Sequence, residues 1–180
     1  MTGSSVEATD DFSRILTPDR LSGSKVTESI EASPTERAAV ARRLGILSVD
    51  RLVAQLTVRG LGSDLLRVEG AWEAAVQQAC VVTLEPVAQG LTGEIVVSFE
   101  TGGGPAGQGE VLVDPEGVDP AEPLPAEGID LGELVVQELA VALDPYPRKP
   151  GAEVPAEYRP PEVETKEGPF AALKALKGEQ

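Results

Sequence analysis

The chain has 180 residues, of which 41% are hydrophobic and 25% are charged, and this length and balance favour one soluble globular domain with loops or a tail. It contains no histidine and a single cysteine, which excludes an intramolecular disulfide and any Cys-His or Ser-His-Asp catalytic site within the chain. The net charge of −15 disfavours nucleic-acid binding by the chain as a whole, because phosphate contacts dominate that affinity.

The N-terminal segment is typical of a cytoplasmic protein. Its first residues, MTGSSVEATDDF, contain neither the basic region nor the apolar run of a secretory signal. The apolar stretches elsewhere are too short to cross a bilayer, so membrane contact is not expected. Two short strands are predicted next, within residues 12–16 and 24–32, the second with alternating apolar and polar residues.

A helix is predicted near residues 34–44. Ser33 can cap it, Pro34 suits the first turn, Glu36 completes a capping box and Gly45 suits the end. Its apolar residues gather on one side, and its arginines are expected to point outward.

A two-residue periodicity predicts strands from residue 52 onward. Apolar and polar residues alternate over 52–59, and one parity is apolar over 66–84 with a single polar exception. A straight strand over 66–84 would reach roughly 60 Å at about 3.3 Å per residue, so a bend or turn must interrupt it. A third apolar run covers 95–99, which favours an antiparallel sheet. The hairpin connection before that run is expected at Pro86, Gly90 and Gly93.

Cys80 belongs to the apolar parity of the run over 66–84. It is predicted to be a small buried side chain on a strand, because Val76 and Val82 share its face. No neighbour in the sequence would lower the pKa of its thiol, and a lone cysteine does not suffice for a structural zinc site in a monomer. Neither a catalytic residue nor a metal or other cofactor is expected, and a hydrolytic enzyme is kept only as a remote alternative.

The second half contains a loop and a second predicted helix. Residues 101–128 are rich in glycine, proline and acidic residues and are expected to form a flexible acidic loop. A helix near 130–143 follows, because Asp130 can cap it and its apolar residues form one broad face. The expected fold class is therefore α+β, an antiparallel β-sheet with a helix near 34–44 and a packed helix near 130–143. It forms a single domain over 11–146.

Residues 147–180 are predicted to form a mobile, Pro-rich tail. The tail ends in GPFAALKALKG, where Phe170, Leu173 and Leu176 recur at three-residue spacing. Two interpretations remain open. The segment either docks on its own domain or folds onto a groove of a partner as a short linear motif, with these three residues as the partner-binding side chains.

Negative charge is concentrated in the second half of the chain. Residues 1–90 carry 9 Lys/Arg and 12 Asp/Glu, a net charge of −3, whereas residues 91–180 carry 6 and 18, a net charge of −12. The acidity serves either solubility or an acidic surface for a basic partner such as a ribosomal protein. Only the first half concentrates enough positive charge for a local contact with RNA phosphates, through Arg37, Arg42, Arg43, Arg51 and Arg59.

Three segments jointly resemble the YceD family of bacterial proteins, described as large ribosomal RNA subunit accumulation proteins. They are ACVVTLEPV, EGIDLGELVVQELAVALDPYPRKPG and the terminal GPFAALKALK. Many members carry Cys-x-x-Cys followed by Leu-Glu-Pro in the first segment. Here Cys80 matches the first cysteine and Thr83 stands in place of the second, so this chain cannot form a paired-cysteine site.

The resemblance implies a role in the synthesis, processing or stability of 23S rRNA, and hence in biogenesis of the large ribosomal subunit, without a catalytic site. We expect a non-catalytic factor that acts through protein contacts, with a ribosomal protein or a large-subunit assembly intermediate as its partner. Direct rRNA binding through the five arginines is the alternative. Neither a membrane nor DNA is expected as a partner.

Overall fold

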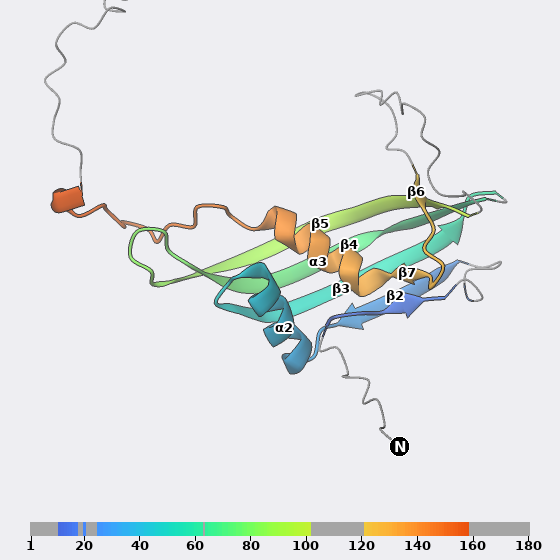
Figure 1. The fold of residues 1–180 in the computed structure, drawn as a ribbon, viewed down its shortest axis with the longest axis horizontal. Coiled ribbons are helices and arrows are strands. Elements are labelled where there is room, and N and C mark those ends of the chain that lie inside the picture. The colour runs from blue at the N-terminus through green and yellow to red at the C-terminus, as the bar shows by residue number, and fades with distance from the viewer. Residues whose placement is uncertain (1–10, 18–19, 21–24, 63, 102–120, 159–180) are drawn as a thin grey trace, which may run out of the picture. The chain divides into compact units, whose positions relative to one another are not determined.

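The computed structural model describes residues 11–17, 20, 25–62, 64–101 and 121–158 (Figure 1). The chain divides into two compact units, residues 1–149 and 150–180. Two helices and seven strands of the described residues lie in the first unit, which is therefore α+β as predicted. In chain order they are β1 (Ile15–Leu16), β2 (Val26–Glu31), α2 (Pro34–Leu44), β3 (Ser48–Gly60), β4 (Leu65–Ala79), β5 (Pro86–Glu100), β6 (Glu122–Pro123), β7 (Ile129–Asp130) and α3 (Leu131–Ala142).

A five-stranded sheet in the order β2-β3-β4-β5-β6 is the framework of the first unit. β2, β3, β4 and β5 pair antiparallel to one another, as predicted. β4 and β5 pair over all fifteen residues of each strand without a shift in register. β6 differs, because it runs parallel to β5 and contributes only two residue pairs. β1 and β7 form a separate two-stranded antiparallel sheet.

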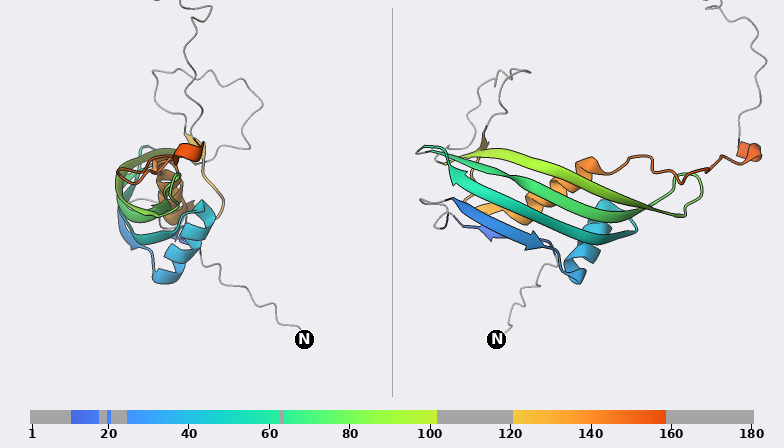
Figure 2. Two further views of the ribbon diagram at one scale, coloured as in Figure 1. Left: turned by 90° about the vertical axis from the view of Figure 1, so that its left-hand side faces the viewer. Right: turned by 180° about the vertical axis from the view of Figure 1, so that it is seen from behind.

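The core lies on one face of the five-stranded sheet. Alternate residues of β3 and β4 point into it, and Leu52, Leu56, Val68 and Val76 are almost inaccessible to solvent. The sheet curls around α3, as Figure 2 shows, and α2 packs against β3. Because the sequence is poor in aromatic residues, most of the core is aliphatic, and Trp72 supplies a ring from β4.

Both predicted helices are confirmed, with their predicted caps. In α2 the Ser33 hydroxyl accepts the Glu36 N–H (3.4 Å) and the Glu36 carboxylate accepts the Ser33 N–H (2.7 Å), which completes the capping box. Gly45 ends the helix with φ +66°, a left-handed conformation that glycine adopts readily. Asp130 caps α3 through the N–H groups of residues 132 and 133. Among the described residues, no helix is both long and apolar enough to span a membrane.

The hairpin connection predicted at Pro86, Gly90 and Gly93 is wrong. Residues 80–85 connect β4 to β5, and all three predicted turn residues lie within β5. Gly93 lies opposite Trp72 in the β4–β5 ladder, and a Cβ on it would lie 2.7 Å from the indole Nε1. This glycine therefore makes room for a ring of the core. The interruption required within residues 66–84 occurs at Cys80.

The predicted acidic loop and tail fall partly outside the described residues. Residues 121–128 are described, and there Leu124 packs against the core and donates its N–H to the Glu100 carbonyl oxygen (3.0 Å). The flexible loop was predicted over residues 101–128, but β6 occupies residues 122 and 123. The last part of the predicted loop is therefore structured. In the second unit, the described residues 150–158 include one short 3-10 helix, η1 (Ala156–Tyr158), which is exposed.

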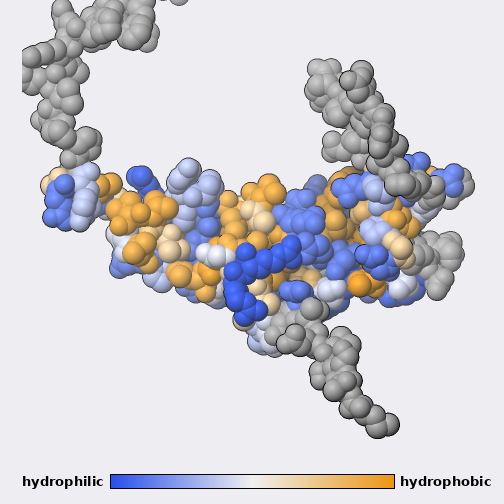
Figure 3. Space-filling model, in the orientation of Figure 1, coloured by the Kyte–Doolittle hydropathy of each residue, from blue (hydrophilic) through white to orange (hydrophobic). Residues whose placement is uncertain are grey.

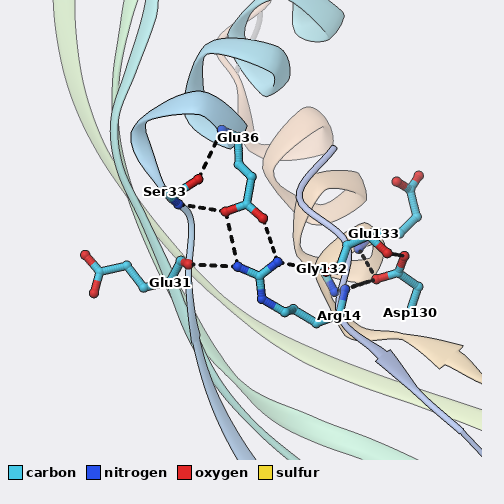
Figure 4. A network of polar contacts seen from close by, with 8 residues as sticks. Arg14, Glu31, Ser33, Glu36, Asp130, Gly132 and Glu133 are labelled. Carbon is cyan, nitrogen blue, oxygen red and sulfur yellow. Dashed lines mark hydrogen bonds and ion pairs between the residues drawn. The ribbon is translucent and has the colours of Figure 1, made fainter. Parts of the chain in front are cut away.

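Arg14 connects the N-terminal segment to α2 and α3 (Figure 4). Its guanidinium donates twice to the Glu36 carboxylate (2.6 and 3.1 Å) and once to the Glu31 carbonyl oxygen (3.3 Å). Its N–H donates to Asp130 (2.8 Å), which also accepts the Ser13 hydroxyl (2.5 Å). The hydrogen bonds from Arg14 are the main reason why the pKa of Glu36 falls to about 2. One polar network thus joins three segments that are distant in sequence.

Candidate functional site: the Cys80 turn and its surroundings

Four of the five arginines that were predicted as RNA contacts are engaged with groups of the chain itself. The partners are Glu133 for Arg43, Glu73 for Arg51, Glu69 for Arg59 and the Asp50 carbonyl oxygen for Arg37. The Arg42 side chain has no hydrogen-bond or ion-pair partner within the described residues. These side chains spread over α2 and β3, and ion pairing already neutralises three of them.

The bidentate pair of Arg43 with Glu133 corrects the expectation that the arginines of α2 point only into solvent. The two contacts are 2.5 and 2.6 Å long, and they join α2 to α3. The hydrogen bond from Arg43 is the main cause of the lowered pKa of Glu133. Arg43 therefore helps to hold two helices together.

Arg37 and Arg42 border an open groove beside α2. The groove has a volume of about 540 Å³ and lies between the helix and the first residues of β3. Ala38, Ala41 and Leu47 give it an apolar lining. This groove is where the unpaired Arg42 would meet a phosphate if the chain contacts RNA directly.

The three residues predicted to bind a partner through the tail, Phe170, Leu173 and Leu176, lie outside the described residues. Their role stays a prediction.

The turn between β4 and β5, residues 80–85, is fixed by its own backbone. The Cys80 N–H donates to the Glu85 carbonyl oxygen (2.8 Å), and the Leu84 N–H donates to the Cys80 carbonyl oxygen (2.9 Å). Leu84 has φ +61°, which is uncommon for a residue with a branched side chain. Such backbone conformations persist where the surrounding contacts enforce them, and they gather at binding sites.

The Cys80 sulfur is the centre of this turn. Its side chain is completely buried, as predicted, but the residue lies in the turn and not on a strand. Sγ accepts the N–H groups of Val82 (3.4 Å), Thr83 (3.5 Å) and Lys149 (3.4 Å). The hydrogen bond from the Lys149 backbone, followed by those from Thr83, lowers the pKa of the thiol to about 6. The expectation of an ordinary thiol pKa is therefore wrong.

Residues 147–149 bind the turn from outside. The Pro147 carbonyl oxygen accepts the Val81 N–H (2.9 Å), and Lys149 Nζ donates to the Glu85 carboxylate (3.0 Å). The segment was predicted as the start of a mobile tail, yet Pro147 is buried there. Local strand patterns do not reveal this contact, because its two sides are more than sixty positions apart.

Large apolar side chains project into solvent from this fixed turn. Leu84 is 76% exposed and Val81 is 45% exposed, and Tyr146 in the adjoining segment is 73% exposed. Figure 3 shows apolar surface at the left-hand end of the first unit, where Figure 1 places this turn. Within the described residues, no cluster of three or more acidic or cysteine side chains could hold a metal ion. The arrangement is suited to binding another surface.

A comparison with protein families shows which family the chain belongs to. Residues 68–177 match the family model described as Large ribosomal RNA subunit accumulation protein YceD. The chain belongs to the YceD family. No curated protein and no solved structure is significantly similar to it.

The YceD match covers particular parts of the fold. It begins within β4, includes the turn at residues 80–85, β5 and α3, and extends to residue 177 of the tail. All five candidate arginines precede it. The sequence did indicate the tail motif and Cys80, but it did not indicate Val81 and Leu84. The one available signal was the pair of adjacent valines at 81 and 82, which breaks the two-residue alternation where the turn begins.

Proposed function

We propose that this chain is a non-catalytic factor in biogenesis of the large ribosomal subunit. It supports the synthesis, processing or stability of 23S rRNA in the cytoplasm, and it acts by contacting a ribosomal protein or an assembly intermediate. The membership of the YceD family carries the proposal, because that family is named for accumulation of large-subunit ribosomal RNA. The name specifies no reaction.

Contact through protein is favoured over contact through RNA by the charges within the matched region. Residues 68–147 contain fifteen acidic residues and not one lysine or arginine. A surface of this composition repels phosphate and attracts basic protein segments. The arginines that would contact RNA lie outside the match, and all but Arg42 are engaged within the fold.

A strain that lacks the chain tests the role in rRNA accumulation. Levels of 23S rRNA and of large-subunit precursors are compared after complementation with the wild-type chain. We expect the deletion to lower 23S rRNA relative to 16S rRNA and the wild-type chain to restore it. Equal ratios with and without the chain would contradict the proposed function.

The salt dependence of binding separates protein contact from direct RNA contact. Association of the purified chain with isolated precursors is measured between 50 and about 200 mM salt, where six or more phosphate contacts lose about a thousandfold in affinity. We expect a shallower loss. A steep loss that persists on protein-free rRNA would favour the arginines instead.

Deletion of residues 168–180 tests the tail motif. We propose that Phe170, Leu173 and Leu176 bind the partner, since three buried apolar side chains contribute roughly 1.5–3 kcal/mol each before ordering costs. The truncated chain should keep its melting temperature and associate more weakly with precursors. Phe170→Ala should reproduce most of that loss. Unfolding of the truncated chain, or undiminished association, would contradict this role.

A further inference from the structure

Over most of its length, β5 presents a backbone edge that has no strand partner among the described residues. β4 covers one side of β5 completely, whereas β6 pairs on the other side only with Phe99 and Glu100. Thirteen of the fifteen residues, 86–98, therefore have no strand beside them within the described parts of the chain. At about 3.3 Å per residue this edge extends for roughly 40 Å. The N–H and C=O groups along such an edge are a template for one more strand.

The opposite edge of the same sheet is protected in the usual ways. β2 has six residues, and Glu28 and Glu31 place charges on it. Glu28 is also paired with Arg20 (2.5 Å). Residues 86–98 of β5 contain one charged side chain, Glu94, and no bulge in their pairing with β4. Natural proteins blunt exposed edges with charges, bulges, short strands or a covering helix. α3 does contact β5, but within the described residues no backbone hydrogen bond joins residues 86–98 to that helix, so the long edge of β5 requires an explanation.

The charge around the β5 edge selects the kind of partner. Glu94 on β5 and Glu138 on α3 have no cationic partner in the part of the chain that the structure describes. Residues 68–147 contain no lysine or arginine. Arg67, opposite Ser98, and Lys149, paired with Glu85, lie near the two ends of this edge, so Glu94 leaves its middle acidic. A basic segment is attracted to it, whereas nucleic acid and a second copy of this chain, with its own net charge of −15, are repelled.

The C-terminal end of α3 supplies apolar surface next to the first half of β5. Asp144 follows the helix, and its carbonyl oxygen accepts a hydrogen bond from Gln78 (3.0 Å), which lies opposite Val87 of β5. Val141, in the last turn of α3, is 85% exposed. Figure 3 shows apolar surface on the face that carries α3. A strand added to β5 would direct every second side chain toward this surface.

We propose that the free edge of β5 binds an extended basic segment of a partner protein as an additional strand. Main-chain hydrogen bonds to residues 86–98 supply affinity, as in other cases of strand addition. Lysine or arginine side chains on one face of the segment lie near Glu94, and apolar side chains on the other face cover the end of α3 near Val141. The proposal deepens the proposed function and rests on it for the ribosomal nature of the partner.

The test uses the full chain and a synthetic peptide of alternating lysine and valine with blocked termini. Amide hydrogen exchange is followed residue by residue with and without the peptide. We expect the peptide to protect every second amide of residues 87–97, because only alternate N–H groups of an edge strand face outward. Protection of consecutive amides, or of none, would overturn the proposal.

Matched charge reversals test where the peptide binds. Glu94→Lys should weaken peptide binding about tenfold, equivalent to about 1.4 kcal/mol, and Val141→Lys should weaken it as well. Glu31→Lys makes the same charge change on β2 at the opposite edge and should alter binding less than about twofold. Equal weakening by Glu31→Lys would show attraction by net charge alone. Protection of the β5 amides that rises with chain concentration, without peptide, would identify a second copy as the occupant. Either result would overturn the proposal.

Complementation keeps this proposal separate from the proposed function. A Glu94→Lys chain, with its peptide binding weakened about tenfold, should restore 23S rRNA less well than the wild type, while Glu31→Lys should restore it fully. Full restoration by Glu94→Lys would reject the β5 edge as a functional surface and leave the proposed function intact. Failure of the wild-type chain to restore rRNA would reject the proposed function, whatever the exchange experiment gives.

Discussion

Residues 11–67 and residues 68–147 balance their charges in different ways. In the first region arginine side chains meet carboxylates, as Arg14 meets Glu36 and Arg43 reaches across to Glu133. The second region contains no basic side chain of its own. Some of its carboxylates pair with cations from other segments, as Glu85 pairs with Lys149 and Glu73 with Arg51. Other acceptors are held by backbone N–H groups. Asp130 accepts two of them at the start of α3, and the Cys80 sulfur accepts three in the turn between β4 and β5.

The comparison distinguishes charged side chains that are paired within the fold from those that remain available to a partner. Arg14, Arg43, Arg51 and Arg59 of the first region are paired with carboxylates within the fold. A run of basic residues in the sequence therefore overstates the positive surface. Glu94 on β5 and Glu138 on α3 form no ion pair with the described residues, so their charge is available to solvent or to a basic ligand. The YceD match begins at residue 68 and covers the whole of the second region.

Asp130 lies where the two regions meet, and its loss should have the largest effect. Asp130→Ala removes the acceptor for Ser13, Arg14, Gly132 and Glu133. A lost cap costs about 0.5–2 kcal/mol and a buried unpaired donor about 1–3 kcal/mol, so we expect a loss of about 2–4 kcal/mol. Urea unfolding measures it. Asp144→Ala, at an exposed acceptor, should cost less than about 1 kcal/mol, and a similar small cost for Asp130→Ala would contradict the central role of this carboxylate.

Glu36 should make the stability depend on acid pH. Its pKa falls to about 2 in the folded chain, so its stabilisation is complete above the ordinary pKa and disappears as the pH falls from about 4.5 to about 2. Because Arg14 is partly exposed, we expect the net effect to be about 1–2 kcal/mol. Glu36→Gln should unfold at lower urea concentration at pH 7 and differ little from the wild type at pH 2. A constant difference between pH 7 and pH 2 would show that the ion pair is not responsible.

Much of the fold could be predicted because its signals are local. The capping residues Ser33 and Asp130 lie next to the helices that they start, and the two-residue alternation of β3 and β4 directly reflects one buried face. The hairpin was predicted in the wrong place because Gly93 is required by packing and not by a turn: a side chain there would clash with Trp72 on the neighbouring strand. The parity of the apolar run also continued by coincidence through Cys80, which hid the turn.

The candidate site was less predictable because its contacts are distant in sequence. Arg43 and Glu133 are separated by 90 positions, and the Lys149 N–H meets the Cys80 sulfur from 69 positions away. Sequence patterns indicate which side chains are buried and on which face they lie. They do not reveal which group, distant in sequence, forms a hydrogen bond or ion pair with a given side chain. The β5 edge could not be predicted for the same reason, because an edge strand can be recognised only when the order of the strands in the sheet is known.

The Cys80 thiol should titrate near neutrality without being needed for function. Thiolate absorbance at 240 nm should rise with a midpoint near pH 6, well below the ordinary thiol range near 8.5. A lowered folded pKa adds stability above the ordinary pKa that is lost as the pH falls to about 6, so the wild type should gain stability over Cys80→Ala as the pH rises through this window. Thr83→Val should raise the midpoint. Cys80→Ala should still support 23S rRNA accumulation, and a midpoint near 8.5 would contradict the hydrogen-bonded thiolate.

Arg42→Ala should have the smallest effect on stability and the clearest meaning for function. Arg42 is the candidate arginine without a partner in the described residues, and it borders the groove beside α2. Its removal should change the free energy of unfolding by less than about 0.5 kcal/mol, whereas Arg51→Ala, which breaks the pair with Glu73, should cost about 0.2–1 kcal/mol. If the chain acts through protein contacts, neither variant changes the salt dependence of its association with large-subunit precursors. If Arg42 contacts rRNA, its loss weakens that association and lowers the salt slope by about one. Arg42→Ala therefore decides whether the first region contributes only to the fold or also to binding.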